Sequence, residues 1–278
     1  MTKPMAKQER KQQRTQERRP SRRRAAFAAA ALSAALLAAA GAAWAEAPAV
    51  LIEPPDMLLV DGEKLSFDIY YGSLPAGHAS LEVASATGER GDVWRISSSV
   101  RSNALVSLFF NVDDRVVSEM DARTLEPRLY EKHISEGRMK KHVRLDYGDS
   151  GFVAAGGETF RVEPGTRDVL SALYLLRGQD LRVGEDVIVR TFDNSKCYQA
   201  RVRVLRREKV STHRGEYQCL VVEPELEGGL KKTAGKLLIY LTDDALKLPV
   251  LMKSKFKVGS LVAELVEATH LAGHEGGR

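Results

Sequence analysis

Two histidines are the residues in this chain most suggestive of a metal site. His133 and His142 flank a turn that the sequence predicts over Ser135 to Arg138, which would make them diagonal neighbours on one face of a hairpin. Imidazole is a common zinc ligand, but a zinc site needs three or four converging ligands. No third ligand is evident from the sequence, so the pattern favours two polar-face residues, and we expect no metal and no cofactor.

Paired acidic residues could do general acid–base chemistry if their carboxyl groups lay side by side. The pairs here are Asp113-Asp114 and Asp243-Asp244. Adjacent residues of a strand point to opposite faces, so neither pair forms such a dyad. Asp114-Arg115 and Asp243-Asp244 are predicted to cap strand ends and turns.

The two cysteines, Cys197 and Cys219, form a candidate disulfide, because an even number of cysteines favours one where the compartment is oxidising. The hairpin register argues against a simple bridge between neighbouring strands. A turn near Gly215 places residue 210 opposite 217 and Cys219 opposite Glu208, so a disulfide would need another strand neighbour or a bulge. The sequence leaves the question open.

No catalytic motif occurs in the sequence. It contains no G-x-S-x-G elbow, phosphate-binding loop, dinucleotide fingerprint or H-E-x-x-H helix. We therefore name no catalytic residues and expect a protein that is not an enzyme. A hydrolase whose residues converge only in the fold is the least favoured alternative.

One apolar run predicts a helix over about 167–177. Asp168 falls in its first turn, Arg177 in its last, and Thr166 and Gly178 are candidate caps. A helix that is apolar nearly all round must be buried on most sides. The candidate core positions of this helix are Asp168, Leu170, Leu173, Tyr174 and Arg177, with its polar ends expected to cap the helix and to pair with a neighbouring strand.

Elsewhere the period of the sequence is two, which is typical of strands with one buried face. Leu65, Phe67 and Ile69 alternate with polar residues, and turn signals recur at short spacing. The fold class is therefore mainly β: a single curved antiparallel sheet, or an open or half β-barrel, of about a dozen strands around one buried apolar helix. A single β-rich domain is expected over 62–270, after a Pro-containing segment at 46–61 and before a disordered tail at 271–278. Residues 104–110 are predicted to form a single turn between strands.

The first 45 residues predict a secretory signal peptide. A basic segment, 1–24, precedes an uncharged alanine-rich run, 25–45, and Ala43 and Ala45 fit a peptidase site with cleavage after Ala45. An uncleaved membrane anchor is the alternative to cleavage, and twin-arginine transport the alternative to the general secretory route. We expect a periplasmic or secreted protein that is not integral to the membrane.

The net charge of +5 comes from this leader, which holds ten basic and two acidic residues. Residues 46–278 carry 32 basic and 35 acidic side chains, so the excess that would favour nucleic-acid binding disappears on cleavage. The basic stretch from Arg201 to Lys209 is predicted to be a solvated face that protects a sheet edge.

Several short segments, taken in their order along the chain, resemble the exported bacterial proteins of the domain-of-unknown-function 3108 family. The segments are Leu65-x-Phe67-x-Ile69-x-Tyr71-Gly72, Ala76-Gly77-x-Ala79-x-Leu81, Val112-Asp113-Asp114-Arg115-Val116-x-Ser118, Asp168-Val-Leu-Ser171-Ala-Leu-Tyr174-x-x-Arg177, Gly215-x-Tyr217-x-Cys219, Leu238 to Asp244, Leu248-Pro249-Val250 and Val258-Gly259-Ser260. The resemblance implies an exported, largely β protein, and it implies no reaction.

A strongly curved sheet cannot fill its own concave side, which a helix or a ligand must cover. The sequence therefore favours a non-catalytic binding or carrier module for an apolar or lipid-like molecule of the cell envelope, with a cavity between helix and sheet. The alternative is an envelope scaffold or assembly factor that acts through protein–protein contacts at an exposed edge or loop patch.

Overall fold

The alternating segments form antiparallel strands in the computed structural model, which describes residues 59–148, 151–193, 195–226, 236–256 and 259–271. The predicted signal peptide, with Ala43 and Ala45, lies outside the described residues, as do positions 46–58 and 272–278. No helix within the described ranges is long and apolar enough to cross a bilayer.

The described part of the chain forms one sheet of fourteen strands. The strands are β1 (Lys64–Tyr71), β2 (Leu74–Gly88), β3 (Gly91–Ser102), β4 (Asp113–Asp121), β5 (Pro127–Glu136), β6 (Met139–Tyr147), β7 (Phe152–Ala155), β8 (Glu158–Arg161), β9 (Asp186–Asp193), β10 (Lys196–Thr212), β11 (Gly215–Leu226), β12 (Lys236–Thr242), β13 (Pro249–Phe256) and β14 (Gly259–Thr269). Two helices accompany them, α3 (Ala104–Ser107) and α4 (Val169–Arg177), and α3 is the predicted turn between strands.

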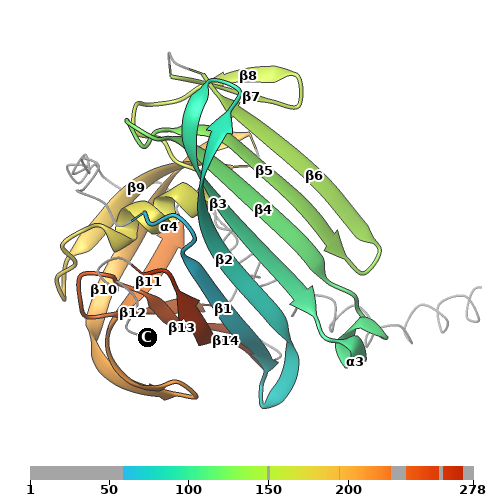
Figure 1. The fold of residues 1–278 in the computed structure, drawn as a ribbon, viewed down its shortest axis with the longest axis vertical. Coiled ribbons are helices and arrows are strands. Elements are labelled where there is room, and N and C mark those ends of the chain that lie inside the picture. Colours follow the sequence, from blue (N-terminus) through green and yellow to red (C-terminus); the bar gives the residue numbers. More distant parts are fainter. Residues whose placement is uncertain (1–58, 149–150, 194, 227–235, 257–258, 272–278) are drawn as a thin grey trace, which may run out of the picture.

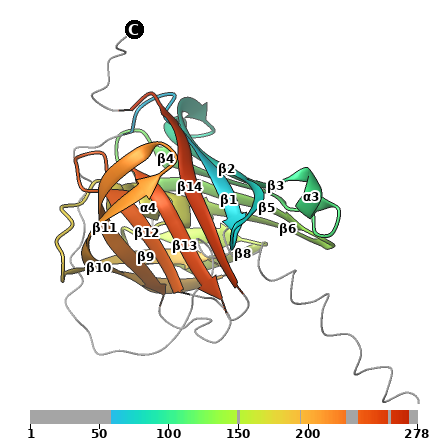
Figure 2. The ribbon, with the colours of Figure 1, turned by 90° about the horizontal axis from the view of Figure 1, so that it is seen from below.

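The sheet consists of two meanders that join in its middle, through the first and the last strand. One runs from β1 to β8, the other from β9 to β14, and β14 pairs with β1. The chain passes from β8 to β9 through α4, and the two meanders curve around this helix (Figures 1 and 2). The end strands β8 and β9 are not paired by backbone hydrogen bonds, but the rings of Phe160 and Phe192 lie 5.5 Å apart. The predicted curved, unclosed antiparallel sheet is confirmed.

Strand alternation places the predicted residues in the core. Leu65, Phe67 and Ile69 are buried, whereas Ser66 and Asp68 between them are half-buried. The inner face also carries a buried ion pair, Lys132–Asp193, whose Nζ and Oδ1 atoms are 2.5 Å apart. This pair links β5 to β9 across the concave side, since the two strands are far apart in the order of the sheet.

Helix α4 is buried as predicted, but its N-cap differs from the sequence prediction. Seven of its nine residues are buried. Asp168, not Thr166, is the N-cap: its carboxylate accepts hydrogen bonds from the backbone N–H groups of Leu170 and Ser171. Asp168 and Ser171 form a reciprocal capping box, which holds the start of the helix more tightly than a lone threonine would.

The predicted register of the β10–β11 hairpin is confirmed, and both cysteines are free thiols. Cys219 lies opposite Glu208, as expected, and opposite Thr242 on its other side, whereas Cys197 lies opposite Phe192. Neither cysteine therefore has the other as a strand neighbour, and the candidate disulfide is not present.

The basic stretch on β10 is balanced by acids but does not protect an edge. Arg201 pairs with Asp186, Arg207 with Asp243 and Lys209 with Glu216. The prediction of an edge strand was wrong, because β10 lies between β9 and β11. These ion pairs are partly or largely exposed and each contributes little to stability.

Candidate functional site

The C-terminal half of α4 contributes Tyr174 and Arg177 to a fully buried cluster. The guanidinium of Arg177 donates to both carboxylate oxygens of Glu63, at 2.7 and 2.9 Å, and the Tyr174 hydroxyl donates to the same carboxylate at 2.9 Å. Glu63 stands just before β1, 114 residues away in sequence. The predicted helix-core residues Tyr174 and Arg177 thus come together, but around a partner that the sequence did not indicate.

The other end of α4 is also saturated with hydrogen bonds. The buried Asp168 carboxylate accepts from the hydroxyls of Ser118 and Ser171, at 2.7 and 2.8 Å, in addition to the two backbone groups. Burial raises the pKa of Asp168, and these hydrogen bonds oppose that shift. Because the predicted polar residues of the helix are satisfied within the fold, they form a structural cluster and present no group to a ligand.

A carboxyl pair that the sequence did not predict lies on the inner face of β4 and β5. Asp114 and Glu136 are both buried, and burial, together with the neighbouring Asp114 carboxylate, raises the pKa of Glu136 to about 7. Asp114 was predicted to cap a strand end. Instead it accepts a hydrogen bond from the Ser135 backbone N–H at 2.8 Å and faces the interior. By contrast, Asp244 caps its turn as expected, accepting from Leu246 and Lys247.

Glu136 should make folding stability depend on pH. An acid whose pKa is about 7 in the folded state and near 4.5 when unfolded keeps its proton longer in the folded chain. Its stabilising contribution is therefore complete below pH 4.5 and is lost as the pH rises to 7. Urea unfolding measures the effect. Between pH 5 and pH 8, we expect the free energy of unfolding of the wild type to fall by about 1–3 kcal/mol more than that of Glu136→Gln. The exposed Glu82→Gln variant should track the wild type, and equal pH profiles for wild type and Glu136→Gln would contradict this assignment.

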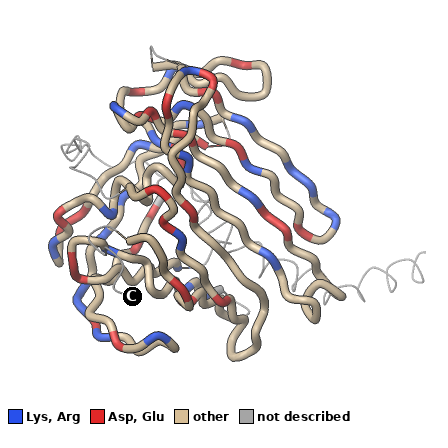
Figure 3. The backbone as a smooth tube through the Cα atoms, viewed as in Figure 1, with Lys and Arg blue, Asp and Glu red and all other residues tan. Residues whose placement is uncertain are grey.

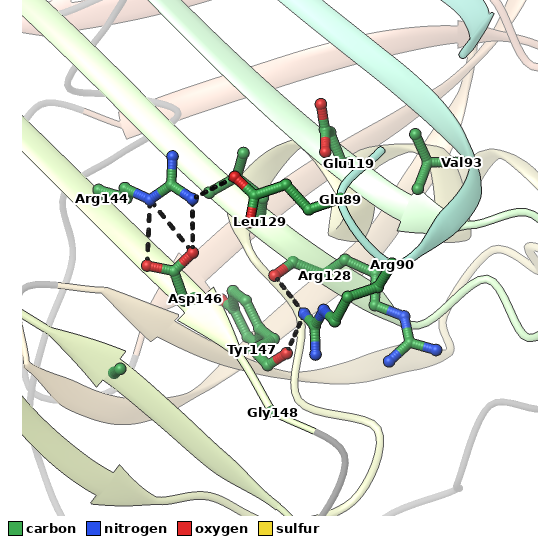
Figure 4. Close-up of a pocket in the computed structure, with 11 residues that line it drawn as sticks. Glu89, Arg90, Val93, Glu119, Arg128, Leu129, Arg144, Asp146, Tyr147 and Gly148 are labelled. Carbon is green, nitrogen blue, oxygen red and sulfur yellow. Dashed lines mark hydrogen bonds and ion pairs between the residues drawn. The ribbon is translucent and has the colours of Figure 1, made fainter. Parts of the chain in front are cut away.

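A cavity of about 360 Å³ opens between the β2–β3 turn and strands β4 to β6 (Figure 4). Its lining is dominated by charged groups that already have partners. Arg144 pairs with Asp146 at 2.9 Å, and Arg90 donates to the backbone carbonyls of Arg128 and Tyr147. This cavity is not the predicted one beside α4, and its balanced charges leave no obvious preference for a ligand.

The largest exposed apolar side chains of the described chain gather at one end of the sheet. We call this group the apolar tip: Leu74, Leu105, Leu108, Phe109 and Met139. Leu105 of α3 is 67% exposed, and Leu108 and Phe109, which follow α3, are 77 and 86% exposed. The tip lies at the end of the molecule remote from α4 (Figures 1 and 2).

Hydrogen bonds hold the three segments of the tip together. The Asn103 side chain caps α3 by accepting from the Val106 N–H, and its amide donates to the Pro75 carbonyl beside Leu74. The Gly137 N–H, at the turn before Met139, donates to the Asn111 carbonyl. The apolar side chains therefore project from an ordered turn.

Basic residues flank the apolar tip on one side. Arg138, Lys140 and Lys141 are exposed at the β5–β6 hairpin end, and no acidic residue occurs between positions 137 and 141. Figure 3 shows this basic stretch next to the uncharged α3 segment. An apolar projection with an adjacent cationic stretch is typical of surfaces that bind anionic lipid.

The comparisons with known proteins decide the family. A family model described as "Protein of unknown function (DUF3108)" matches residues 66–266. The chain belongs to the DUF3108 family. No curated protein matches it.

Two solved structures are similar to this DUF3108 chain at low sequence identity. A beta-barrel-like protein of the DUF1849 family from Brucella abortus superposes with a TM-score of 0.53 at 12% identity, over 77% of this chain and 99% of that one. A protein from Bacteroides fragilis with a YmcC-like fold, assigned as exported, gives a TM-score of 0.36 at 12% identity over the same shares. The first likeness supports the fold and carries no function.

The segments that carry the family resemblance form the interior frame of the DUF3108 fold. They fall on β1, β2, β4, α4, β11, β12 and the starts of β13 and β14, and they include Asp168, Tyr174 and Arg177 of the buried clusters. All five residues of the apolar tip lie outside these segments. The family pattern therefore explains the packing of the sheet around α4, and the tip must be interpreted from its own chemistry.

Proposed function

We propose that this protein is an exported, non-catalytic lipid-binding module of the cell envelope, and that its apolar tip docks on an anionic lipid surface. The observation that carries the proposal is the high exposure of Leu105, Leu108 and Phe109 beside the basic end of the β5–β6 hairpin. The predicted lipid-like partner is retained, but the saturated clusters around α4 favour the tip, and not the interior, as the place of contact.

The energetics of the tip fit a peripheral contact. Fully burying one leucine or phenylalanine side chain contributes about 1.5–3 kcal/mol, so partial insertion of three gives several kcal/mol. Each lysine or arginine near an anionic membrane adds about 1 kcal/mol. Because the tip is already ordered, little conformational entropy is lost on docking.

Export is supported by the sequence of the leader. A basic segment, an uncharged run and the small residues Ala43 and Ala45 suit cleavage by a signal peptidase. A chain cleaved there would begin at Glu46 and reach the membrane through the folded domain.

The tip should control binding to vesicles. The protein is purified from the exported fraction, and its N-terminal sequence is read to check that Glu46 comes first. We expect it to float with phosphatidylglycerol vesicles and much less with phosphatidylcholine vesicles. Leu108→Ser/Phe109→Ser should lose more than about tenfold in affinity for phosphatidylglycerol, because the main insertion residues are removed.

Matched variants distinguish the effect of the apolar tip on vesicle binding from the effect of exposed apolar side chains elsewhere on the protein. Phe152→Ser/Val183→Ser removes two other exposed apolar side chains and should bind vesicles like the wild type. Arg138→Glu/Lys140→Glu should weaken binding to phosphatidylglycerol and remove the preference for anionic lipid. Failure of the wild type to bind either vesicle would refute the proposal, and tip-dependent crosslinking to one protein in place of lipid would favour the scaffold alternative.

A further inference from the structure

The two histidines on the outer face of the β5–β6 hairpin converge on one carboxylate. His133 on β5 and His142 on β6 stack with ring centroids 4.2 Å apart and an angle of 12° between the ring planes. The Nε2 atoms of His142 and His133 lie 2.6 and 3.2 Å from the same atom, Oε1 of Glu131. All three side chains are at least partly accessible to solvent.

The loop of the β5–β6 hairpin is shorter than the sequence predicts, which changes how the two histidines face each other. Glu136 pairs with Met139, so the loop is the two residues Gly137 and Arg138, and His133 lies directly opposite His142. The expected four-residue turn would have placed the histidines diagonally. Direct opposition brings the rings into contact, and Glu131, two residues before His133 on the same face, becomes the third group that the sequence did not reveal.

The three ligand atoms suit a divalent transition metal ion. They all lie within 4.8 Å of one another. Two ligands bound tetrahedrally to zinc, each at about 2.0–2.1 Å, are about 3.3 Å apart, so modest side-chain rotation would seat an ion between them. Imidazole nitrogen and carboxylate oxygen together suit zinc and its neighbours better than calcium or magnesium.

We infer that Glu131, His133 and His142 form a binding site for a zinc-like divalent transition metal ion, with solvent completing the coordination. The site goes beyond the proposed lipid contact and does not depend on it. Three protein ligands with an open position distinguish this site from a closed structural zinc site.

The site combines one carboxylate with two imidazoles, and charged side chains surround it. The hydrogen bond from His142 and the two nearby imidazoles lower the pKa of Glu131, whereas its partial burial raises it. Three basic neighbours share the face. Arg144 lies opposite Glu131 but is engaged by Asp146 and Glu89, Arg115 lies opposite His133 with an exposed side chain, and the exposed Lys140 is two residues from His142 on β6.

Zinc titration of the untagged, metal-stripped protein tests the site. Calorimetry with zinc chloride should give one ion per chain, and His133→Asn and His142→Asn should each weaken binding at least about tenfold. Cobalt(II) should give the visible absorption of a nitrogen–oxygen site, and the His142→Asn variant should lose it. Both histidines are largely exposed, so both variants should fold, as circular dichroism would verify.

Two other histidine–carboxylate pairs provide matched controls. His78 with Asp68 and His213 with Glu264 have contacts of 2.8 and 2.7 Å but include a single histidine each. His78→Asn and His213→Asn should bind zinc like the wild type, and so should Cys197→Ser, which removes the exposed thiol. The assignment would be overturned if zinc did not bind at about 100 µM, or if His133→Asn and His142→Asn bound it as tightly as the wild type.

Discussion

Replacing Arg177 with methionine should destabilise the fold by about 3–5 kcal/mol. Arg177 and Glu63 are each only 1% exposed, so the substitution leaves a carboxylate buried without its cation. The Tyr174 ring, 4.7 Å from the guanidinium, loses its cationic neighbour as well. Urea unfolding at pH 7 measures the loss, and Glu63→Leu should give a similar one.

A double variant shows whether the single substitutions destabilise the fold by leaving a charge buried without its partner or by removing packing contacts. Glu63→Leu/Arg177→Met removes both charges together, so it should cost less than either single change. The exposed pair Arg101–Asp113 is the control, and Arg101→Met should cost less than about 1 kcal/mol. If the double variant lost as much as the sum of the two single changes, the cluster would be stabilised by packing and not by compensation of charge.

Replacing Gly77 with alanine should cost about 2–3 kcal/mol, because backbone occupies the place of the new methyl group. A Cβ atom built on Gly77 would lie 2.1 Å from the Arg101 carbonyl oxygen on β3. Gly77 belongs to a segment that carries the family resemblance, and this close approach of β2 and β3 gives a physical reason for glycine there. It also follows directly on Ala76, whose carbonyl accepts from the Asn103 N–H at the base of the apolar tip.

The Gly77→Ala variant has a matched control in Gly148→Ala. Gly148 has an ordinary φ, and its nearest neighbour would be 3.4 Å from an added Cβ, so this change should alter stability by less than about 0.5 kcal/mol. Urea midpoints compare the two variants. Equal stability of Gly77→Ala and the wild type would mean that β2 and β3 separate without cost at this point.

The sequence predicted the parts of the fold that local pattern determines. Alternation identified the buried face of β1, and the apolar run identified α4, because burial in a sheet or helix imposes a period of two or a continuous apolar surface. The N-cap was misplaced by two residues. The choice between Thr166 and Asp168 depended on Ser171 and Ser118, and Ser118 lies on a distant strand.

The groups that the sequence missed depend on contacts between distant segments. Nothing near Arg177 indicates Glu63. Glu136 was interpreted as part of a turn, although its two-residue spacing from Ile134 fits the inner face of β5. The apolar tip combines residues 74, 105–109 and 139, and only the folded hairpins bring them together.

The apolar tip is the proposed surface of contact with lipid, and a tryptophan placed there reports directly on that contact. In Phe109→Trp, phosphatidylglycerol vesicles should shift the tryptophan emission to shorter wavelength, and brominated acyl chains should quench it. Val183→Trp, at an exposed position in the loop before β9, controls for nonspecific adsorption and should show neither effect. If the tryptophan at position 109 stayed solvent-exposed with vesicles present, or if both variants responded alike, the proposed lipid contact would be contradicted.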